Sequence, residues 1–177
     1  MDPNVASGLI GFGGAVVGAG AAIFGTWIQQ RHQAHLAKEE RDTARQDAAF
    51  DTAVQAVFAA KDLFRRRQSG IAEDDWKHQL SGELDRLRLA TLSLSSAEVR
   101  RRLVQVAEML MYWERLVPFG AGTSEKYRAV REVIDDTLDA LGEYRRTGTI
   151  PMRSGEFSEA LGWLDEWVAQ WEDEEGS

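Results

Sequence analysis

The chain has 177 residues, of which 44% are hydrophobic and 28% charged, and a net charge of -8; this composition excludes a disordered chain and a multi-span membrane protein. It contains no cysteine, which excludes disulfides, thiolate zinc sites and thiol catalysis. The excess of acids disfavours nucleic acid as a partner, because such binding depends on Lys and Arg neutralising phosphates.

The first element is an uncharged, glycine-rich segment. No Asp, Glu, Lys or Arg occurs between Asp2 and Arg31. As a helix, residues 5–28 would be about 36 Å long, enough for a hydrocarbon core about 30 Å thick. Trp27 lies at the far end and Arg31 just beyond it, and both residue types are typical of the membrane interface. We therefore predict a transmembrane helix over residues 5–28.

Two other interpretations of this segment stay open. A cleaved export signal needs a basic N-terminal region, but the chain begins with Met-Asp-Pro-Asn. A buried helix of a soluble protein is disfavoured because glycine lowers helix propensity in water.

Basic residues flank the segment only on its C-terminal side. The positive-inside rule therefore predicts a single-pass protein of the inner (plasma) membrane, with a short extracytoplasmic N-terminus (1–4) and a cytoplasmic C-terminal domain.

Small residues follow three- and four-residue steps along the predicted span, so they share one helix face. This glycine face consists of Ser7, Gly11, Gly14, Gly18, Ala22 and Gly25. Small side chains let two backbones approach closely and gain dispersion contacts. We expect a homo-oligomer formed through the glycine face. The alternative is a plain anchor, since Gly and Ala are common in spanning helices.

A polar helical stalk is predicted over residues 29–48, where neither Gly nor Pro breaks the helix. His32, His35 and Glu39 fall on one face of it and could offer a metal three ligands. An HxxH spacing alone is weak, and a polar stalk near lipid headgroups explains these residues equally well. We expect no metal and no cofactor. The same helix continues to Arg67 with an apolar stripe: Phe50, Val54, Val57, Phe58 and Phe64.

A helical bundle is predicted over residues 49–172. The second helix covers 73–92, with a stripe that begins at Trp76 and includes Leu80, Leu84 and Leu87. The third begins at Ser95, where Ser95 and Glu98 have the spacing of a capping box, and runs to Val117 before Pro118. The fourth begins at Thr123 or Ser124, and residues 147–151 break it. The fold class is all-α, with the transmembrane helix continuing into a long helix and then a four- to five-helix antiparallel bundle.

Two charged runs lie within this predicted bundle. Arg100, Arg101 and Arg102 occupy the first turns of the third helix, against the preference of the helix dipole. We expect them to pair with acidic neighbours, and contact with lipid or a partner is the alternative. Asp135 and Asp136 are adjacent, so their side chains diverge, and we expect both to be solvated.

The fifth helix is expected from Ser154 to Glu172, followed by an acidic tail (173–177). Tryptophan recurs every fourth residue, at Trp163, Trp167 and Trp171, beside a second apolar stripe of Phe157, Leu161, Leu164 and Val168. The two stripes make an apolar band wider than one contact needs. Two interpretations are left open: the tryptophans complete the core, or they contact an unknown protein partner.

A Gly/Ala-rich span is followed by a polar helix in the stretch VVGAGAAIFGTWIQQRHQAHLAKEERD. Over about the first 65 residues, this arrangement resembles small single-pass membrane proteins of high-GC actinobacteria and their mobile elements. The resemblance implies a membrane location, and the group has no assigned activity. No catalytic motif occurs in the chain, so we expect no enzyme. The predicted function is a membrane-anchored helical scaffold or adaptor. The alternatives are a pore-forming or holin-like effector, and a soluble helical enzyme or ligand-binding domain.

Overall fold

The computed structural model describes the backbone of residues 3–71 and 75–175, and the side chains of residues 30, 31, 33, 35–71 and 75–171. Every regular element in this part of the chain is helical, which confirms the all-α prediction. The elements are α1 (Pro3–Gln68), α2 (Trp76–Thr91), α3 (Ala97–Met111), the 3-10 turn η1 (Trp113–Arg115), α4 (Thr123–Thr147) and α5 (Gly155–Glu175).

The chain divides into two units, residues 1–44 and residues 45–177, and α1 contributes to both. Within the residues that the structure describes, no helix is long and apolar enough to cross a membrane. The side chains of residues 1–29 lie outside the described ones. That range holds the predicted N-terminus, span, glycine face and Trp27. The side chains of the predicted acidic tail also lie outside the described ones. These features stay predictions.

The predicted stalk has no side chain that is fully buried in its described part. Between Gln30 and Ala48 the described side chains are exposed or half-exposed, and Ala49 is the first buried one. A helix that is polar on all sides has no face to bury. Packing of α1 therefore starts where its apolar periodicity starts.

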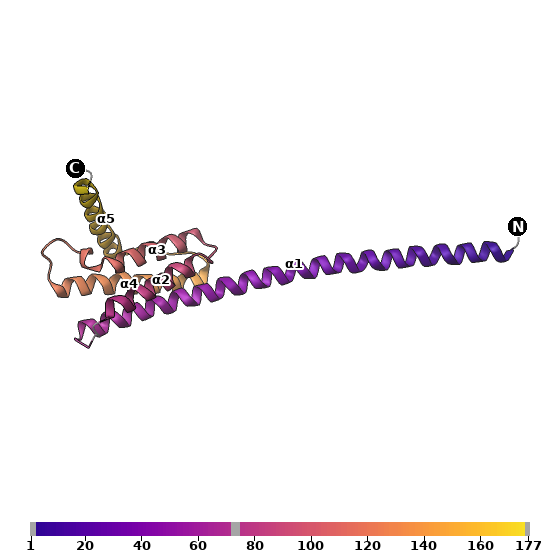
Figure 1. The fold of residues 1–177 in the computed structure, drawn as a ribbon. Helices are drawn as coiled ribbons and strands as arrows, with labels where there is room; N and C mark the ends of the chain where they lie inside the picture. Colours follow the sequence, from indigo (N-terminus) through magenta and orange to yellow (C-terminus); the bar gives the residue numbers. More distant parts are fainter. Residues whose placement is uncertain (1–2, 72–74, 176–177) are drawn as a thin grey trace. The chain divides into compact units, whose positions relative to one another are not determined.

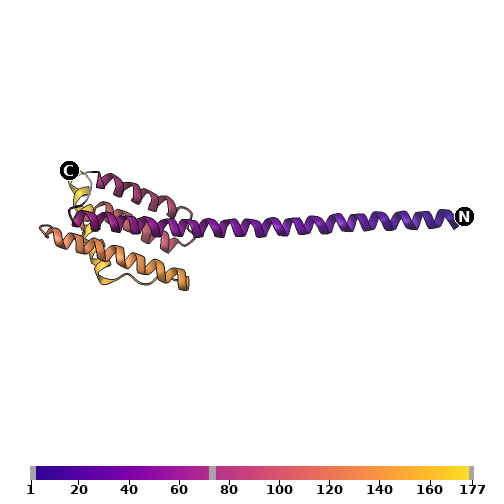
Figure 2. The same cartoon turned by 90° about the horizontal axis from the view of Figure 1, so that it is seen from below.

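The second unit is a helical bundle (Figure 1, Figure 2). The C-terminal part of α1 runs beside α2, α3 and α4, and α5 crosses these helices at a steep angle. Two ion pairs join α1 to α4: Lys61 with Asp135 at 2.6 Å and Arg145 with Asp51 at 2.7 Å. Residue numbers rise on one helix as they fall on the other, so α1 and α4 are antiparallel.

Three alanines lie on the buried face of α1. Ala53, Ala56 and Ala60 are each at most 1% exposed, and such short side chains let neighbouring helices approach closely. Phe58, in contrast, is 53% exposed. Its predicted place in the buried stripe is therefore wrong, because the 100° step from the fully buried Val57 turns it toward solvent.

An aromatic cluster closes one end of the bundle core. Phe64 meets Trp76 and Trp113 edge to face at centroid distances of 5.9 and 5.6 Å, and Trp113 stacks on Tyr127 at 5.1 Å. Trp113 belongs to η1, because α3 ends at Met111 and does not continue to Val117 as predicted. The tighter 3-10 turn carries the indole into this cluster.

The start of α3 also differs from the prediction by one residue. Ser96 is the N-cap, and its hydroxyl accepts a hydrogen bond from the Val99 amide at 3.3 Å. Arg100 donates to the carbonyl oxygens of Leu94 and Ser95. This bridge holds Ser95 in the preceding loop, so the predicted capping box at Ser95 does not form. The predicted start of α4 at Thr123 is confirmed.

Candidate functional site

The first turn of α5 is held by a largely buried carboxylate of α4. Ser154 precedes α5, and its hydroxyl accepts a hydrogen bond from the Phe157 amide at 3.0 Å. Asp136 accepts a hydrogen bond from the Ser154 amide at 3.0 Å. Both amides belong to the group that helix geometry leaves without partners at a helix start. The position where α5 begins is therefore set by a side chain from α4.

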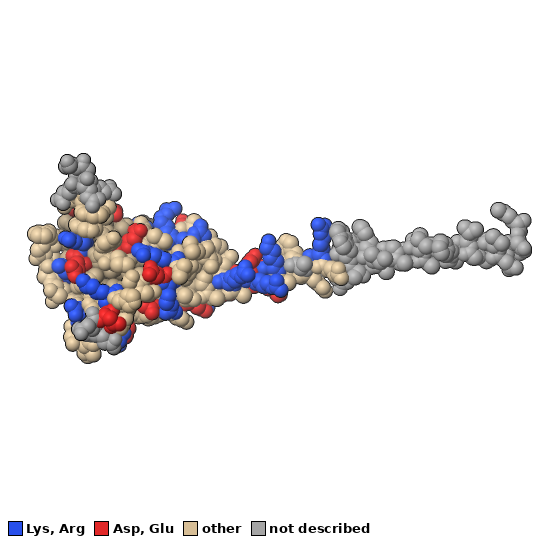
Figure 3. Space-filling view, in the orientation of Figure 1, with Lys and Arg blue, Asp and Glu red and all other residues tan. Residues whose placement is uncertain are grey.

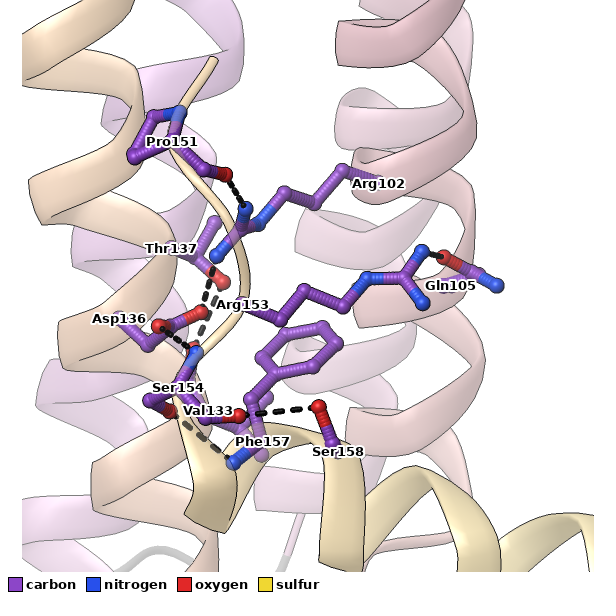
Figure 4. A network of polar contacts seen from close by, with 10 residues as sticks. All are labelled: Arg102, Gln105, Val133, Asp136, Thr137, Pro151, Arg153, Ser154, Phe157 and Ser158. Carbon is purple, nitrogen blue, oxygen red and sulfur yellow. Dashed lines mark hydrogen bonds and ion pairs between the residues drawn. The ribbon is translucent and has the colours of Figure 1, made fainter.

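Arg102 of α3 completes this network (Figure 4). Its guanidinium pairs with the Asp136 carboxylate and donates to the Pro151 carbonyl at 2.9 Å. It also lies over the Phe157 ring, 5.2 Å from the centroid. The side chains of Arg102 and Asp136 are only 5% and 13% exposed. The predicted acidic partner for this arginine run is confirmed for Arg102, and the prediction that Asp136 is solvated is wrong.

The buried side chains of α5 all lie in its first half. Phe157, Ala160 and Leu164 are buried, whereas Leu161 is half-buried and Val168 is 36% exposed. From Val168 to Trp171 every side chain is exposed, and Figure 1 shows this end of the helix projecting from the other helices. The apolar stripe from Phe157 to Val168 therefore stops packing against other helices before α5 ends.

The predicted partner-contact tryptophans lie at the edge of this packing. Trp163 and Trp167 are half-buried, and Trp171 is 52% exposed. The Trp167 ring lies 5.4 Å from Tyr112 and 6.3 Å from Trp171, with the two indoles almost parallel at 8°. Arg115 lies over Trp167 at 5.0 Å. We call Tyr112, Trp167 and Trp171 the α5 aromatic row.

Two adjoining hollows flank Trp163, and we call them together the α5 groove. One, of about 380 Å³, lies between α5, α4 and the loop that follows η1. The other, of about 650 Å³, lies between α5 and the same loop and is also lined by Trp167 and Phe119. Phe119 is fully exposed, at 101%. It stands between Pro118 and Gly120 in the loop, and its exposure was not predicted from the sequence.

The other predicted positions belong to the first unit, residues 1–44. Arg31 is exposed on α1, in the other unit, and the glycine face and Trp27 are outside the described side chains. His35 contacts Glu39 at 3.2 Å, while the side chain of His32 is not described. Among the described residues, no group of three or more His, Asp or Glu is placed to hold a metal ion.

Positive and negative side chains are interspersed over the face of the bundle drawn in Figure 3. Helix α5 differs, because its 21 residues include several acids and no Lys or Arg. The site thus combines exposed aromatic rings and two hollows with a helix that carries acids only, while Arg115, Lys126 and Arg128 line the hollows from outside α5. Comparison of the chain with protein-family models, with curated proteins and with solved structures finds no match.

Proposed function

We propose that this protein is a non-enzymatic scaffold or adaptor, anchored in the inner membrane by residues 5–28, that presents α5 to a protein partner. The observation that carries the proposal is the α5 aromatic row. Its outer member, Trp171, is half-exposed on a helix end that leaves the bundle. Aromatic side chains already stacked on one another lose little conformational freedom on binding, which makes such rows effective contact sites.

The anchor and the self-association are supported by the sequence. Residues 5–28 carry no charge, and the glycine face repeats with helical spacing. Self-association through that face would place several α5 helices near one another. A partner with more than one matching segment would then gain avidity without any new contact.

The partner surface is tested by removing the outer aromatic rings. Full-length Trp167→Ala/Trp171→Ala should remain in the membrane fraction and lose the proteins that co-purify with the wild type in mild detergent. Phe58→Ala is the matched control, since it removes an exposed ring from α1 and should retain those proteins. The adaptor proposal fails if the two variants retain the same set.

The oligomer is tested on the glycine face. Gly14→Leu/Gly18→Leu should abolish cross-linked oligomers in membranes, because the larger side chains prevent close approach. Val16→Leu/Ile23→Leu changes residues off that face and should leave the cross-linked ladder intact. Oligomers that persist in the glycine variant contradict the predicted interface. An unchanged membrane-potential dye signal during expression separates the scaffold from the pore-forming alternative.

A further inference from the structure

We propose that the α5 groove binds a basic amphipathic helix of a partner protein. This inference rests on the proposed adaptor function and specifies the chemistry of its partner. The contact combines two apolar anchors with Lys or Arg side chains that face the rim of the groove. Such a helix presents apolar residues three and four positions apart, the spacing used by helices that bind in grooves.

The smaller hollow has an apolar floor. Leu116 is 1% exposed, Ala129 and Ala160 are buried, and Trp163 stands at the side, half-buried. A volume of about 380 Å³ is within the range of ligand-sized pockets, roughly 300–1,000 Å³. The adjoining hollow, next to Trp167, shares the Trp163 side. One helix lying along α5 can therefore place one apolar side chain in each hollow.

Carboxylates dominate the rim of the smaller hollow. It is lined by Glu125, Glu132, Glu156 and Glu159, and Arg128 is the one cation among the described residues that line it. The Arg128 Nε lies 3.9 Å from Glu132, the long limit of an ion pair. Within the described part of the chain, Glu156 and Glu159 form no ion pair, and both are exposed.

The rim has two consequences for the occupant. A Lys or Arg placed over Trp163 would gain a cation–π contact in addition to its attraction to the carboxylates. An anionic lipid surface would be repelled by the same carboxylates. Complementary charge therefore selects a basic protein segment.

A second copy of this chain is the less suitable occupant. Several arginines of its bundle are already paired with carboxylates on the same chain: Arg65 and Arg66 with Asp62, Arg145 with Asp51, and Arg146 with Glu143. Docking them in the groove would first require those pairs to break. A separate partner helix with unpaired Lys or Arg has no such cost.

The test uses the full chain in phosphatidylcholine nanodiscs and a fluorescein-labelled synthetic helix of Leu and Lys, with Leu at heptad positions a and d. Binding is followed by fluorescence anisotropy against empty nanodiscs. The wild type should bind this peptide and should not bind the corresponding Leu/Glu peptide. Affinity should fall as salt is raised, because exposed charges are screened.

Charge reversal locates the contact. Glu156→Lys/Glu159→Lys should weaken binding by about tenfold or more, since close charge pairs across an interface couple strongly. Glu40→Lys/Asp47→Lys makes the same change in net charge at exposed positions of α1. Its affinity for the Leu/Lys peptide should stay within about threefold of the wild-type affinity. Trp163→Ala should weaken binding at unchanged net charge.

Four results would overturn the inference: no binding of the Leu/Lys peptide, equal weakening in both charge-reversal variants, no weakening in the groove variant, or equal binding of the Leu/Glu peptide. The outcome is separable from that of the adaptor proposal. If the Leu/Lys peptide fails to bind while Trp167→Ala/Trp171→Ala still loses its partners, only the basic-helix inference falls. If the peptide binds but partner capture does not depend on those tryptophans, only the adaptor proposal falls.

Discussion

Replacing Asp136 by alanine should destabilise the bundle more than the loss of an exposed ion pair would. The substitution leaves the Arg102 guanidinium at 5% side-chain exposure without its carboxylate. It also removes the acceptor of the Ser154 amide at the start of α5. The Arg102 guanidinium and the Ser154 amide would then each lack one hydrogen-bond acceptor while remaining shielded from water.

The expected cost follows from that burial. Removing one member of a buried ion pair costs about 3–5 kcal/mol, and the lost hydrogen bond to the Ser154 amide adds about 1 kcal/mol. A domain of this size is stable by roughly 5–15 kcal/mol in total. Asp136→Ala should therefore remove a large fraction of the free energy of unfolding. Asp51→Ala breaks the Arg145 pair, whose side chains are 62% and 50% exposed, and should cost at most about 1 kcal/mol.

The assay is urea unfolding of the full chain in mild detergent, followed by near-ultraviolet circular dichroism. That signal reports the packed rings of Phe64, Trp76 and Trp113. A third variant, Arg102→Met/Asp136→Leu, replaces both charges by apolar groups and should recover most of the stability, as it does for other buried pairs. If Asp136→Ala unfolds within about 1 kcal/mol of Asp51→Ala, the pair is not desolvated and our account of how α5 is positioned is refuted.

The remaining predictions concern helix ends and glycines, and the same unfolding assay measures them. Ser96→Ala should cost about 1 kcal/mol because it removes the N-cap acceptor of α3, whereas Ser95→Ala should be nearly neutral; the reverse order would restore the capping box expected from the sequence. Gly148→Ala should destabilise by about 1–2 kcal/mol, because this residue has φ +73° after α4. Gly82→Ala should stabilise by about 0.5–1 kcal/mol, since a Cβ there meets nothing within 4 Å inside a helix; a loss of stability at this position would show that α2 packs differently.

Much of the bundle could be predicted from periodicity and helix-end signals. The stripe of α2 is buried as expected, and α4 begins where Thr123 indicates and ends before Gly148. These features depend on residues near one another in the chain, so they are visible in the sequence. The errors at Phe58 and at Trp113 occur where packing against other helices decides the orientation of a side chain or the end of a helix.

The sequence by itself determined that the chain is helical, where most helices begin and end, and that α5 carries more apolar surface than one contact can cover, because amphipathic spacing is a local property. It also predicts the uncharged segment at residues 5–28. Only the tertiary structure decided which stripe of α5 faces the core and how Trp171 is left exposed. That choice depends on Arg102 and Asp136, which are 34 residues apart and whose contact no local pattern encodes. The same packing brought Glu125 and Glu156 to one hollow, so the acidic groove exists only in the folded bundle.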